Sequence, residues 1–169
     1  TGKFRLEHSV VEIADIVSAA VDMCRPAMVK KLQHLQIRLP PRQFSVYGDP
    51  IRLTQILSNL LDNANKYTPS GGEIILAVEV VGEEMTIRVS DNGIGISAAV
   101  LPNIFELFVR DTRVQASYGG GLGIGLAVVR QLVEAHGGSI TGKSPGNGLG
   151  SEFTVTLPIA EAATAASTD

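Results

Sequence analysis

Residues 49–67, DPIRLTQILSNLLDNANKY, decide the fold of this chain, because they predict a long helix with one apolar face. Asp49 followed by Pro50 is a helix start signal, since aspartate accepts free backbone N–H groups and proline suits the first helical position. Apolar residues then recur at helical spacing as far as about Lys66. They are Leu53, Ile56, Leu57, Leu60 and Leu61. This helix needs an apolar layer to pack on, and its asparagines lie near the edge of the buried face.

The rest of the chain predicts strands and helices in a mixed order. Alternating or β-rich patterns predict strands over residues 4–8, 35–39, 44–47, 73–81, 85–91, 139–142 and 151–157. Helical spacing predicts further helices over 12–31 and 123–136, and residues 97–121 suggest a short helix followed by a flexible loop. Strands 73–81 and 85–91 predict an antiparallel hairpin. We therefore predict a two-layer α/β (α+β) sandwich, with a mixed, mostly antiparallel sheet covered on one face by about three helices.

The composition is that of one globular domain: 169 residues, 44% hydrophobic and 18% charged. A net charge of -3 without a long basic run argues against nucleic acid or an anionic membrane as a partner. Cys24 is the only cysteine, so no internal disulfide forms, and we expect a small buried helix residue there. The chain begins Thr1-Gly2-Lys3 without an initiator methionine, which suggests a fragment of a longer protein. We expect the Ala-, Thr- and Ser-rich tail over 159–169 to be disordered.

One stripe of the helix carries Asn59, Asn63 and Lys66, because residues at i, i+4 and i+7 share a face. The amide oxygen of Asn63 is a hard ligand of the kind that Mg²⁺ takes together with phosphate oxygens and waters. Lys66 could hold a phosphate as a point charge, and a solvated lysine at a helix end is the alternative. Asn65 reads as a structural tie to a neighbouring loop.

Asp91-Asn92-Gly93-Ile94-Gly95 follows a predicted strand and is the second candidate site segment. A simple turn needs only one glycine, and a turn aspartate is the plainer interpretation. Two glycines flanking Ile94 instead suggest a backbone surface for a planar ring. Asp91 would then accept a hydrogen bond from an exocyclic amine.

A third segment, the glycine run 119–125, leads straight into a predicted helix, where free N–H groups favour an anion such as phosphate. The dinucleotide fingerprint is not met there. Residues 137–144 match the P-loop pattern letter for letter, but they follow a helix and run into a turn and a strand, which is the wrong context. His8, His34 and His136 are scattered, without cysteine or carboxylate at metal-ligand spacing.

Together these segments resemble the catalytic ATP-binding domain of bacterial sensor histidine kinases, members of the Bergerat-fold ATPase superfamily. Residues 59–67 resemble the N box of that family, 91–95 the G1 box, 105–108 the F box and 121–126 the G2 box. The resemblance extends to about Pro158. It implies a Bergerat fold with a flexible ATP lid, and a catalytic domain over 1–158 whose residues 1–11 follow a dimerisation and phosphoacceptor hairpin.

The resemblance also implies roles for individual residues. Asp91 would bind the adenine amino group, Asn63 would ligate Mg²⁺, and Asn59, Lys66 and Tyr67 would surround the phosphates, with Asn59 and Lys66 as the catalytic pair. Arg110 and Arg113 would lie in the lid near the γ-phosphate. The other residues implied to bind ATP are Gly93, Ile94, Gly95, Ile96, Phe108, Gly121, Leu122, Gly123, Gly125 and Leu126.

Asn59 bears on the reaction. Relatives that hydrolyse ATP carry a glutamate there, and glutamate can activate water as a general base whereas an amide cannot. A helix cap or packing amide is the alternative role.

None of the three histidines is followed by an acidic residue, as the family's acceptor histidine is. We therefore expect a cytoplasmic protein-histidine kinase domain of two-component signal transduction. It would bind Mg-ATP and donate the γ-phosphoryl group to a histidine on a separate dimerisation hairpin of the same protein. A response regulator receiver domain would act downstream. A non-enzymatic nucleotide-binding regulatory module and a self-contained ATPase are the alternatives.

Overall fold

The computed structural model describes residues 5–106 and 122–160 of the chain. In these ranges the helices are α1 (Ile13–Lys30), α2 (Pro50–Tyr67) and α4 (Leu122–Ala135), with a short 3-10 helix η1 (Leu101–Asn103). The strands are β1 (Ser9–Glu12), β2 (His34–Arg38), β3 (Ser45–Gly48), β4 (Glu73–Val81), β5 (Glu84–Asp91), β6 (Ser139–Lys143) and β7 (Ser151–Pro158). The helices and the hairpin expected from the sequence are confirmed to within a residue or two at their ends.

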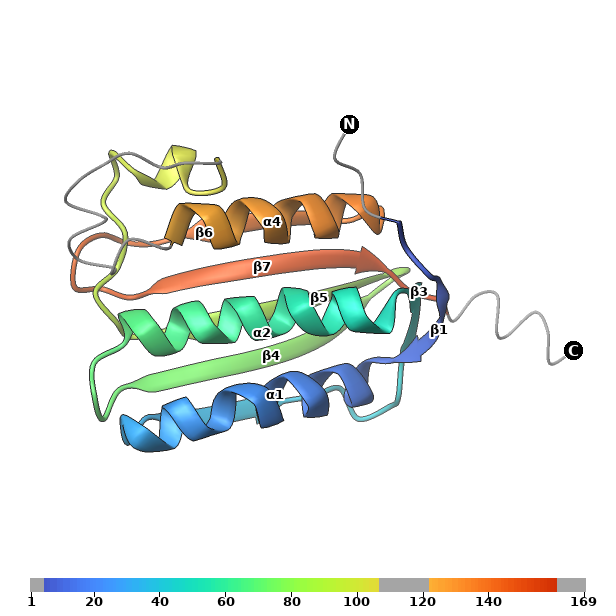
Figure 1. Cartoon of the computed structure of the whole chain (residues 1–169), viewed down its shortest axis with the longest axis horizontal. Helices are drawn as coiled ribbons and strands as arrows, with labels where there is room; N and C mark the ends of the chain where they lie inside the picture. The colour runs from blue at the N-terminus through green and yellow to red at the C-terminus, as the bar shows by residue number, and fades with distance from the viewer. Residues whose placement is uncertain (1–4, 107–121, 161–169) are drawn as a thin grey trace, which may run out of the picture.

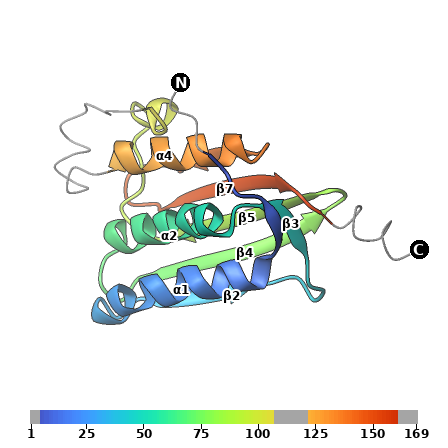
Figure 2. The ribbon, with the colours of Figure 1, turned by 45° about the vertical axis from the view of Figure 1, so that its right-hand side comes forward.

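Two layers make up the fold (Figures 1 and 2). Five strands form a sheet in the order β2-β4-β5-β7-β6, in which β2 pairs with β4 in parallel and the other neighbours are antiparallel. Helices α1, α2 and α4 cover one face of this sheet. The predicted two-layer α/β sandwich with a mixed, mostly antiparallel sheet is therefore confirmed. β1 and β3 form a separate antiparallel pair at one end.

The core lies between the two layers, because alternate side chains of each strand face the helices. β4, β5 and β7 contribute Ile74, Leu76, Val78, Met85, Ile87, Val89, Phe153, Val155 and Leu157, all buried. The middle helix, α2, contributes Leu57, Leu60 and Leu61, each at most 1% exposed. The apolar stripe that predicted this helix is the stripe that packs on the sheet. None of the helices within 5–106 and 122–160 combines the length and the apolar character that crossing a membrane requires.

Asp49 caps the start of α2, as expected. Its Oδ1 accepts the backbone N–H groups of Ile51 (3.0 Å) and Arg52 (3.3 Å), and its Oδ2 accepts the N–H of Glu7 (3.0 Å). The bond from Glu7, followed by those from the first turn, holds the pKa of Asp49 below its usual value. The cap therefore also ties the N-terminal segment to the helix.

His136 joins the end of α4 to the start of α2. Its buried ring accepts the backbone N–H of Asp49 at Nε2 (3.1 Å), while Nδ1 lies 2.8 Å from the carbonyl oxygen of Leu132. Because Nε2 accepts, Nδ1 carries the proton and donates. A Cβ at position 48 would stand 2.7 Å from the His136 ring, so Gly48 leaves room for this contact.

The N-terminal strand differs from the prediction. Within residues 5–8, part of the expected strand 4–8, the chain has no regular structure, and β1 begins at Ser9. Strand formation depends on a partner, and β3 pairs with residues 9–12, where buried Val11 lies opposite buried Val46. The alternation of polar and apolar residues before Ser9 meets no such partner.

The C-terminal boundary also differs from the expectation. Ile159 donates its backbone N–H to the carbonyl of Glu83 (3.0 Å), and Ala160 donates to that of Ser45 (2.8 Å). These two residues therefore belong to the folded unit and not to the tail. Residues 161–169 lie outside the described ranges.

The turn between α1 and β2 holds a leucine in the left-handed region. Leu32 has φ 54° and its side chain is 72% exposed. The N–H groups of Leu32 and Gln33 donate to the carbonyls of Val29 and Met28, both at 3.0 Å, which is the double hydrogen bond of a Schellman helix end. Glycine is the usual residue at this position, because a Cβ there is strained.

We expect Leu32→Gly to raise the free energy of unfolding by about 0.5–1 kcal/mol. The strain of a left-handed residue, about 1–2 kcal/mol, exceeds the extra chain entropy of glycine, about 0.5–1 kcal/mol. Urea denaturation of both proteins measures the difference. Leu32→Ala is the matched control, because it removes the same exposed side chain and keeps the strained Cβ. An equal gain in stability for both variants would contradict the explanation.

Candidate functional site

The candidate site lies at one end of the sandwich. There the C-terminal end of α2, the end of β5, the N-terminal end of α4 and the connection from β6 to β7 come together (Figure 1, left). These segments include the N box and G1 box residues that the sequence singled out. Tertiary structure therefore brings the two leading candidate segments to the same place.

Asp91 ends β5 with both carboxylate oxygens engaged. Oδ1 accepts the backbone N–H of Gly93 (2.9 Å), and Oδ2 accepts the hydroxyl of Ser151 from the neighbouring strand β7 (2.8 Å). Burial raises the pKa of Asp91 above its usual value, and the two hydrogen bonds oppose that shift. Each carboxylate oxygen keeps a further acceptor position, so Asp91 can still bind a donor.

Ser151 is a site residue that sequence reasoning missed. It lies directly opposite Asp91 in the register of β5 and β7. These strands are sixty residues apart in the chain, and no local pattern encodes such a register. The only local signal was a hydroxyl residue at the predicted start of a strand, which is too common to single it out.

Gly93 and Gly95 are required by close backbone packing, and their expected contact with a planar ring stays a prediction. A Cβ on Gly93 would collide with the carbonyl oxygen of Tyr67, and a Cβ on Gly95 would collide with that of Gly146. Gly95 also has φ 74°. The side on which a Cβ would stand is thus filled by protein backbone at both glycines. The glycines allow this loop to pack tightly between α2 and the β6–β7 connection.

Backbone hydrogen bonds hold the same loop on both sides. Ile94 donates its N–H to the carbonyl of Tyr67 (3.0 Å) and accepts the N–H of Gly148 (2.6 Å). The N–H of Ile96 donates to the hydroxyl of Ser144 (2.9 Å). Ser144 ends the stretch that matches the P-loop pattern, and this stretch runs from α4 through β6, so the rejection of a P-loop is confirmed.

The stripe on α2 carries an amide with an unsatisfied group. Asn63 is 8% exposed, and its Nδ2 has no hydrogen-bond partner within the part of the chain that the structure describes. A buried amide without a partner costs about 1–3 kcal/mol, so this position favours binding a polar ligand. Asn59, one turn earlier, is half-buried.

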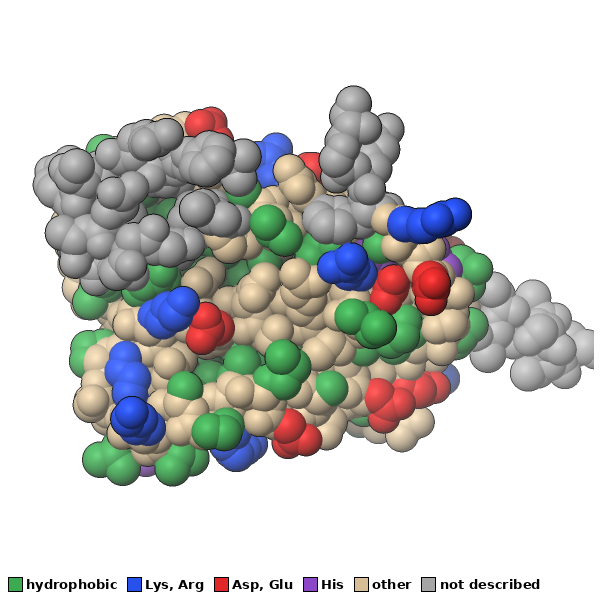
Figure 3. Space-filling model, in the orientation of Figure 1, with side chains coloured by type: hydrophobic (Ala, Val, Ile, Leu, Met, Phe, Trp, Pro, Cys, Tyr) green, Lys and Arg blue, Asp and Glu red, His purple; other side chains and the backbone are tan. Residues whose placement is uncertain are grey.

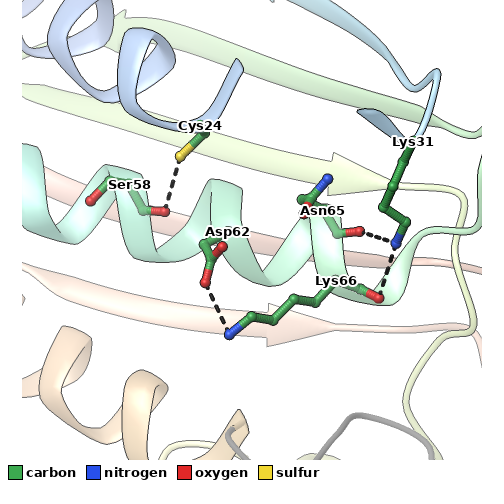
Figure 4. Close-up of polar contacts among 6 residues, drawn as sticks. All are labelled: Cys24, Lys31, Ser58, Asp62, Asn65 and Lys66. Atoms are coloured by element: carbon green, nitrogen blue, oxygen red, sulfur yellow. Dashed lines mark hydrogen bonds and ion pairs between the residues drawn. The ribbon is translucent and has the colours of Figure 1, made fainter. Parts of the chain in front are cut away.

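Lys66 lies at the same end of α2 but points along the helix. Its Nζ forms an ion pair with Asp62 Oδ2 at 3.1 Å, and its side chain is 53% exposed (Figure 4). An exposed i,i+4 pair contributes only about 0.3–0.5 kcal/mol, so a phosphate can compete for this lysine. Tyr67, at the end of the helix, is 8% exposed and packs in the core.

Asn65 is a structural tie, as we interpreted it. Its Nδ2 donates to Gln33 Oε1 (2.7 Å), while its carbonyl accepts from Gln33 Nε2 (3.0 Å) and Lys31 Nζ (2.6 Å). The sequence did not identify the partners, since they come from the turn after α1.

The glycine-rich segment is described only in part. Phe108, Arg110, Arg113 and Gly121 lie outside the described residues, and for Leu122 and Gly123 the structure describes only their place at the start of α4. Among the residues that the structure describes, none apart from its neighbours in the helix comes within 4 Å of the place where a Cβ on Gly125, in the first turn of α4, would stand.

Leu126 and Ile96, two of the residues expected to contact the ligand, are buried. Leu126 is 0% exposed and Ile96 is 4% exposed, and both belong to the hydrophobic core. They lie within or beside glycine-rich motifs, but motif membership does not distinguish a residue that faces a ligand from one that faces the core. Both pack in the core, and their contacts with a ligand stay predictions.

The residues expected to form the site offer polar groups of three kinds. The amides, one carboxylate and one lysine lie at the same end of the sandwich. No group of three or more His, Cys, Asp or Glu able to hold a metal occurs within 5–106 and 122–160. Mg²⁺ fits such a site, because it commonly takes one or two protein oxygens and completes its shell with phosphate and water. Figure 3 shows Lys, Arg, Asp and Glu side chains scattered over the helix-layer face, with most of the acidic ones in the right half, away from the site.

Comparison with known proteins places the chain among ATPase domains. Residues 48–161 match the family model for histidine kinase-, DNA gyrase B- and HSP90-like ATPases. The chain is 35% identical over 162 residues to the sensor histidine kinase WalK of Bacillus subtilis (strain 168), a match that covers 94% of this chain and 26% of that protein. The chain therefore spans about a quarter of the length of this curated relative.

Solved structures agree with that comparison. The mycobacterial sensor histidine kinase MprB superposes with a TM-score of 0.78 at 25% identity, covering 89% of this chain and 98% of that one. Full-length ShkA, solved in complex with AMPPNP, superposes with a TM-score of 0.79 at 28% identity, covering 95% of this chain and 33% of that one. Both share the two-layer sandwich.

Because burial raises the pKa of Asp91, we expect the folded state to bind its proton more tightly than the unfolded state does. Stability therefore falls as pH rises from about the unfolded value of 3.8 through the folded pKa. Asp91→Asn removes this dependence, since its amide can accept from Gly93 and donate to the Ser151 hydroxyl. The difference in unfolding free energy, wild type minus variant, should decrease over that pH range, as measured by urea denaturation at a series of pH values.

Asp22→Asn, an exposed aspartate on α1, is the matched control for this pH series. The difference in unfolding free energy between the wild type and Asp91→Asn could instead stay constant or increase with pH. That result would contradict a raised pKa of Asp91 in the folded state.

Proposed function

Because the chain belongs to the family of histidine kinase-, DNA gyrase B- and HSP90-like ATPases, and its relatives are sensor histidine kinases, we propose that it binds Mg-ATP and donates the γ-phosphoryl group to a histidine on a separate dimerisation hairpin of the same protein. It would act in the cytoplasm, as the kinase domain of a two-component system with a response regulator receiver domain downstream.

One observation carries this proposal: the hydrogen bond from Ile94 to the Tyr67 carbonyl joins the Asp91 loop to the end of α2. It sets a fixed carboxylate beside a helix turn that presents a buried amide and an exposed lysine. A carboxylate suits the amino group of a base, whereas the amide and the lysine suit a metal-bound phosphate. The base of a nucleoside triphosphate would thus face the carboxylate, and its phosphates would face the amide and the lysine.

On the base side, Asp91 would accept a hydrogen bond from the adenine amino group. Ser151 and the Gly93 N–H hold the carboxylate, so its orientation is set before a ligand arrives. Preorganisation of this kind lowers the entropy cost of binding. ShkA, a structural relative, was solved with the ATP analogue AMPPNP, which supports a nucleotide ligand for this fold.

On the phosphate side, Asn63 would hold Mg²⁺ through its amide oxygen, and Lys66 would exchange Asp62 for a phosphate oxygen. Asn59 and Tyr67 would complete the surroundings of the phosphates. When bound, Mg²⁺ supplies charge neutralisation on the phosphates. The N-terminus of α4 would add free backbone N–H groups that favour a phosphate.

The reaction would be transfer and not hydrolysis, because Asn59 is an amide and cannot take a proton from water as a glutamate can. Phosphoryl transfer then depends mainly on positioning and on charge neutralisation. His136 is a poor acceptor, since it is buried and both of its ring nitrogens are engaged. An acceptor histidine on a separate hairpin is consistent with this arrangement.

Asp91→Ala should weaken the binding of Mg²⁺ with a non-hydrolysable ATP analogue by about 10- to 100-fold, the value of a hydrogen bond to a charged group. Isothermal titration calorimetry on the wild type and the variant measures the change. Asp22→Ala, which removes an exposed aspartate on α1, is the matched control and should bind as the wild type does.

The same titrations repeated without Mg²⁺ test the metal assignment. Asn63→Ala should lose most of the gain in affinity that Mg²⁺ gives the wild type. Unchanged affinity in Asp91→Ala would refute the adenine contact, whatever the metal result.

We expect phosphate to reach a histidine when the chain is mixed with the dimerisation hairpin of its own protein and labelled ATP. Acid-labile, base-stable label on the hairpin identifies a phosphohistidine. Nucleotide binding without transfer would instead favour a non-enzymatic regulatory module, and substantial hydrolysis by the chain alone would favour a self-contained ATPase. The hairpin without this chain is the control.

A further inference from the structure

The end of α2 leaves backbone carbonyls without partners inside the helix, as every helix end does. Here other segments supply the donors. The carbonyls that they satisfy are those of Asn65, Lys66, Tyr67 and Thr68. The loop after β5 bonds one of them, and the turn between α1 and β2 bonds the other three. The turn that carries the phosphate side of the site is therefore fixed from outside.

Gln33 is the centre of this arrangement. Its Nε2 donates to the carbonyls of Asn65 (3.0 Å) and Thr68 (2.7 Å), and its Oε1 accepts from Asn65 Nδ2 (2.7 Å). Gln33 is 9% exposed and Asn65 is 6% exposed, so water does not offer ready replacements for these bonds. An amide is needed here, because it supplies two donors and an acceptor at one place.

Lys31 adds a charge to the same helix end. Its Nζ lies 2.6 Å from the carbonyl of Asn65 and 3.4 Å from that of Lys66, pointing between them (Figure 4). A cation is favoured at a helix C-terminus, because the free carbonyls carry partial negative charge.

The turn that delivers these two side chains is strained. Leu32, between Lys31 and Gln33, has φ 54° although its side chain is 72% exposed and adds little to the core. Strain of this kind persists where the surrounding structure requires the conformation. The Schellman hydrogen bonds and the bonds of Gln33 to α2 together account for it.

We propose that Gln33 is a positioning residue for the nucleotide site, acting through the last turn of α2. The inference rests on the proposed function. Loss of Gln33 would leave the Asn65 side chain and the Thr68 carbonyl without this partner and allow the turn to move. Asn63 and Lys66 lie on that turn, and its Tyr67 carbonyl holds the Asp91 loop through Ile94. Gln33 thereby orients both halves of the site without contacting the ligand.

The test is Gln33→Leu, which keeps the approximate size of the side chain and removes its donors and acceptor. We expect the dissociation constant for Mg²⁺ with a non-hydrolysable ATP analogue to rise about tenfold, as measured by calorimetry at a temperature where the variant is fully folded. A purely structural role would lower stability without changing the affinity of the folded protein. Gln36→Leu, three residues further along and exposed on β2, is the matched control and should bind as the wild type does.

Amide hydrogen exchange supplies a readout that needs no nucleotide. In Gln33→Leu the N–H of Ile94, bonded to the Tyr67 carbonyl, should exchange about tenfold faster than in the wild type under conditions where local opening limits exchange. The N–H of Val155 in the middle of β7 should change less, because it reports global unfolding. Equal acceleration at both amides would overturn the positioning role.

The double variant Gln33→Leu/Asn65→Leu keeps the test usable if the single variant is poorly folded. Replacing both partners by apolar side chains should recover stability, because neither position then carries a buried side-chain amide that has lost its partner. Its affinity should stay reduced, since the Thr68 carbonyl still lacks the Gln33 donor. Wild-type affinity in either variant would overturn the proposal.

The outcomes separate the two proposals. If the wild type binds the analogue and Gln33→Leu binds it equally well, the proposed function stands and the positioning role fails. If the wild type does not bind, the proposed function fails and the nucleotide role of Gln33 fails with it. Hydrogen exchange then still shows whether Gln33 holds the loop to α2.

Discussion

The free carbonyls at the C-terminal end of α2 are the constraint on which the candidate site depends. Ile94 bonds the carbonyl of Tyr67, and Gln33 with Lys31 bonds those on either side. Each bond links a different part of the chain to the same helix turn. The loop from β5 and the turn from α1 are therefore held in place by the way one helix ends.

Close backbone packing completes the frame around Asp91. Gly93 packs against the carbonyl of Tyr67, Gly95 against that of Gly146, and Gly150 against that of Asp91 itself, in each case where a Cβ would collide. Three segments thus meet through backbone atoms, which leaves little freedom for the carboxylate between them. In the proposed function, this rigidity would preorganise the side of the site that binds the base. The phosphate side is more adaptable, since Lys66 is exposed and shares an ion pair that a ligand can replace.

Much of the fold could be predicted because its signals are local. Helical periodicity located α1, α2 and α4, Asp49 with Pro50 located the start of α2, and β-rich runs located the β4–β5 hairpin. The position of β1 could not be predicted, because it depends on the partner strand β3 and not on its own alternation. The box pattern located Asn63 and Asp91, but it also included Leu126, which is buried in the core. A motif records which residues occur together and does not record which way each side chain points.

By itself the sequence determined the elements, the family and the types of chemical group at the site, because periodicity, capping and motif spacing are properties of neighbouring residues. Only the tertiary structure decided which partners those groups contact. It paired Ser151 with Asp91 across strands that are far apart in the chain. It also joined Gln33, in the turn after α1, to Asn65 of α2. It also showed that Gly93 makes room for the carbonyl of Tyr67. Long-range hydrogen bonds and backbone contacts of this kind depend on the folded arrangement of the layers, which no short stretch of sequence encodes.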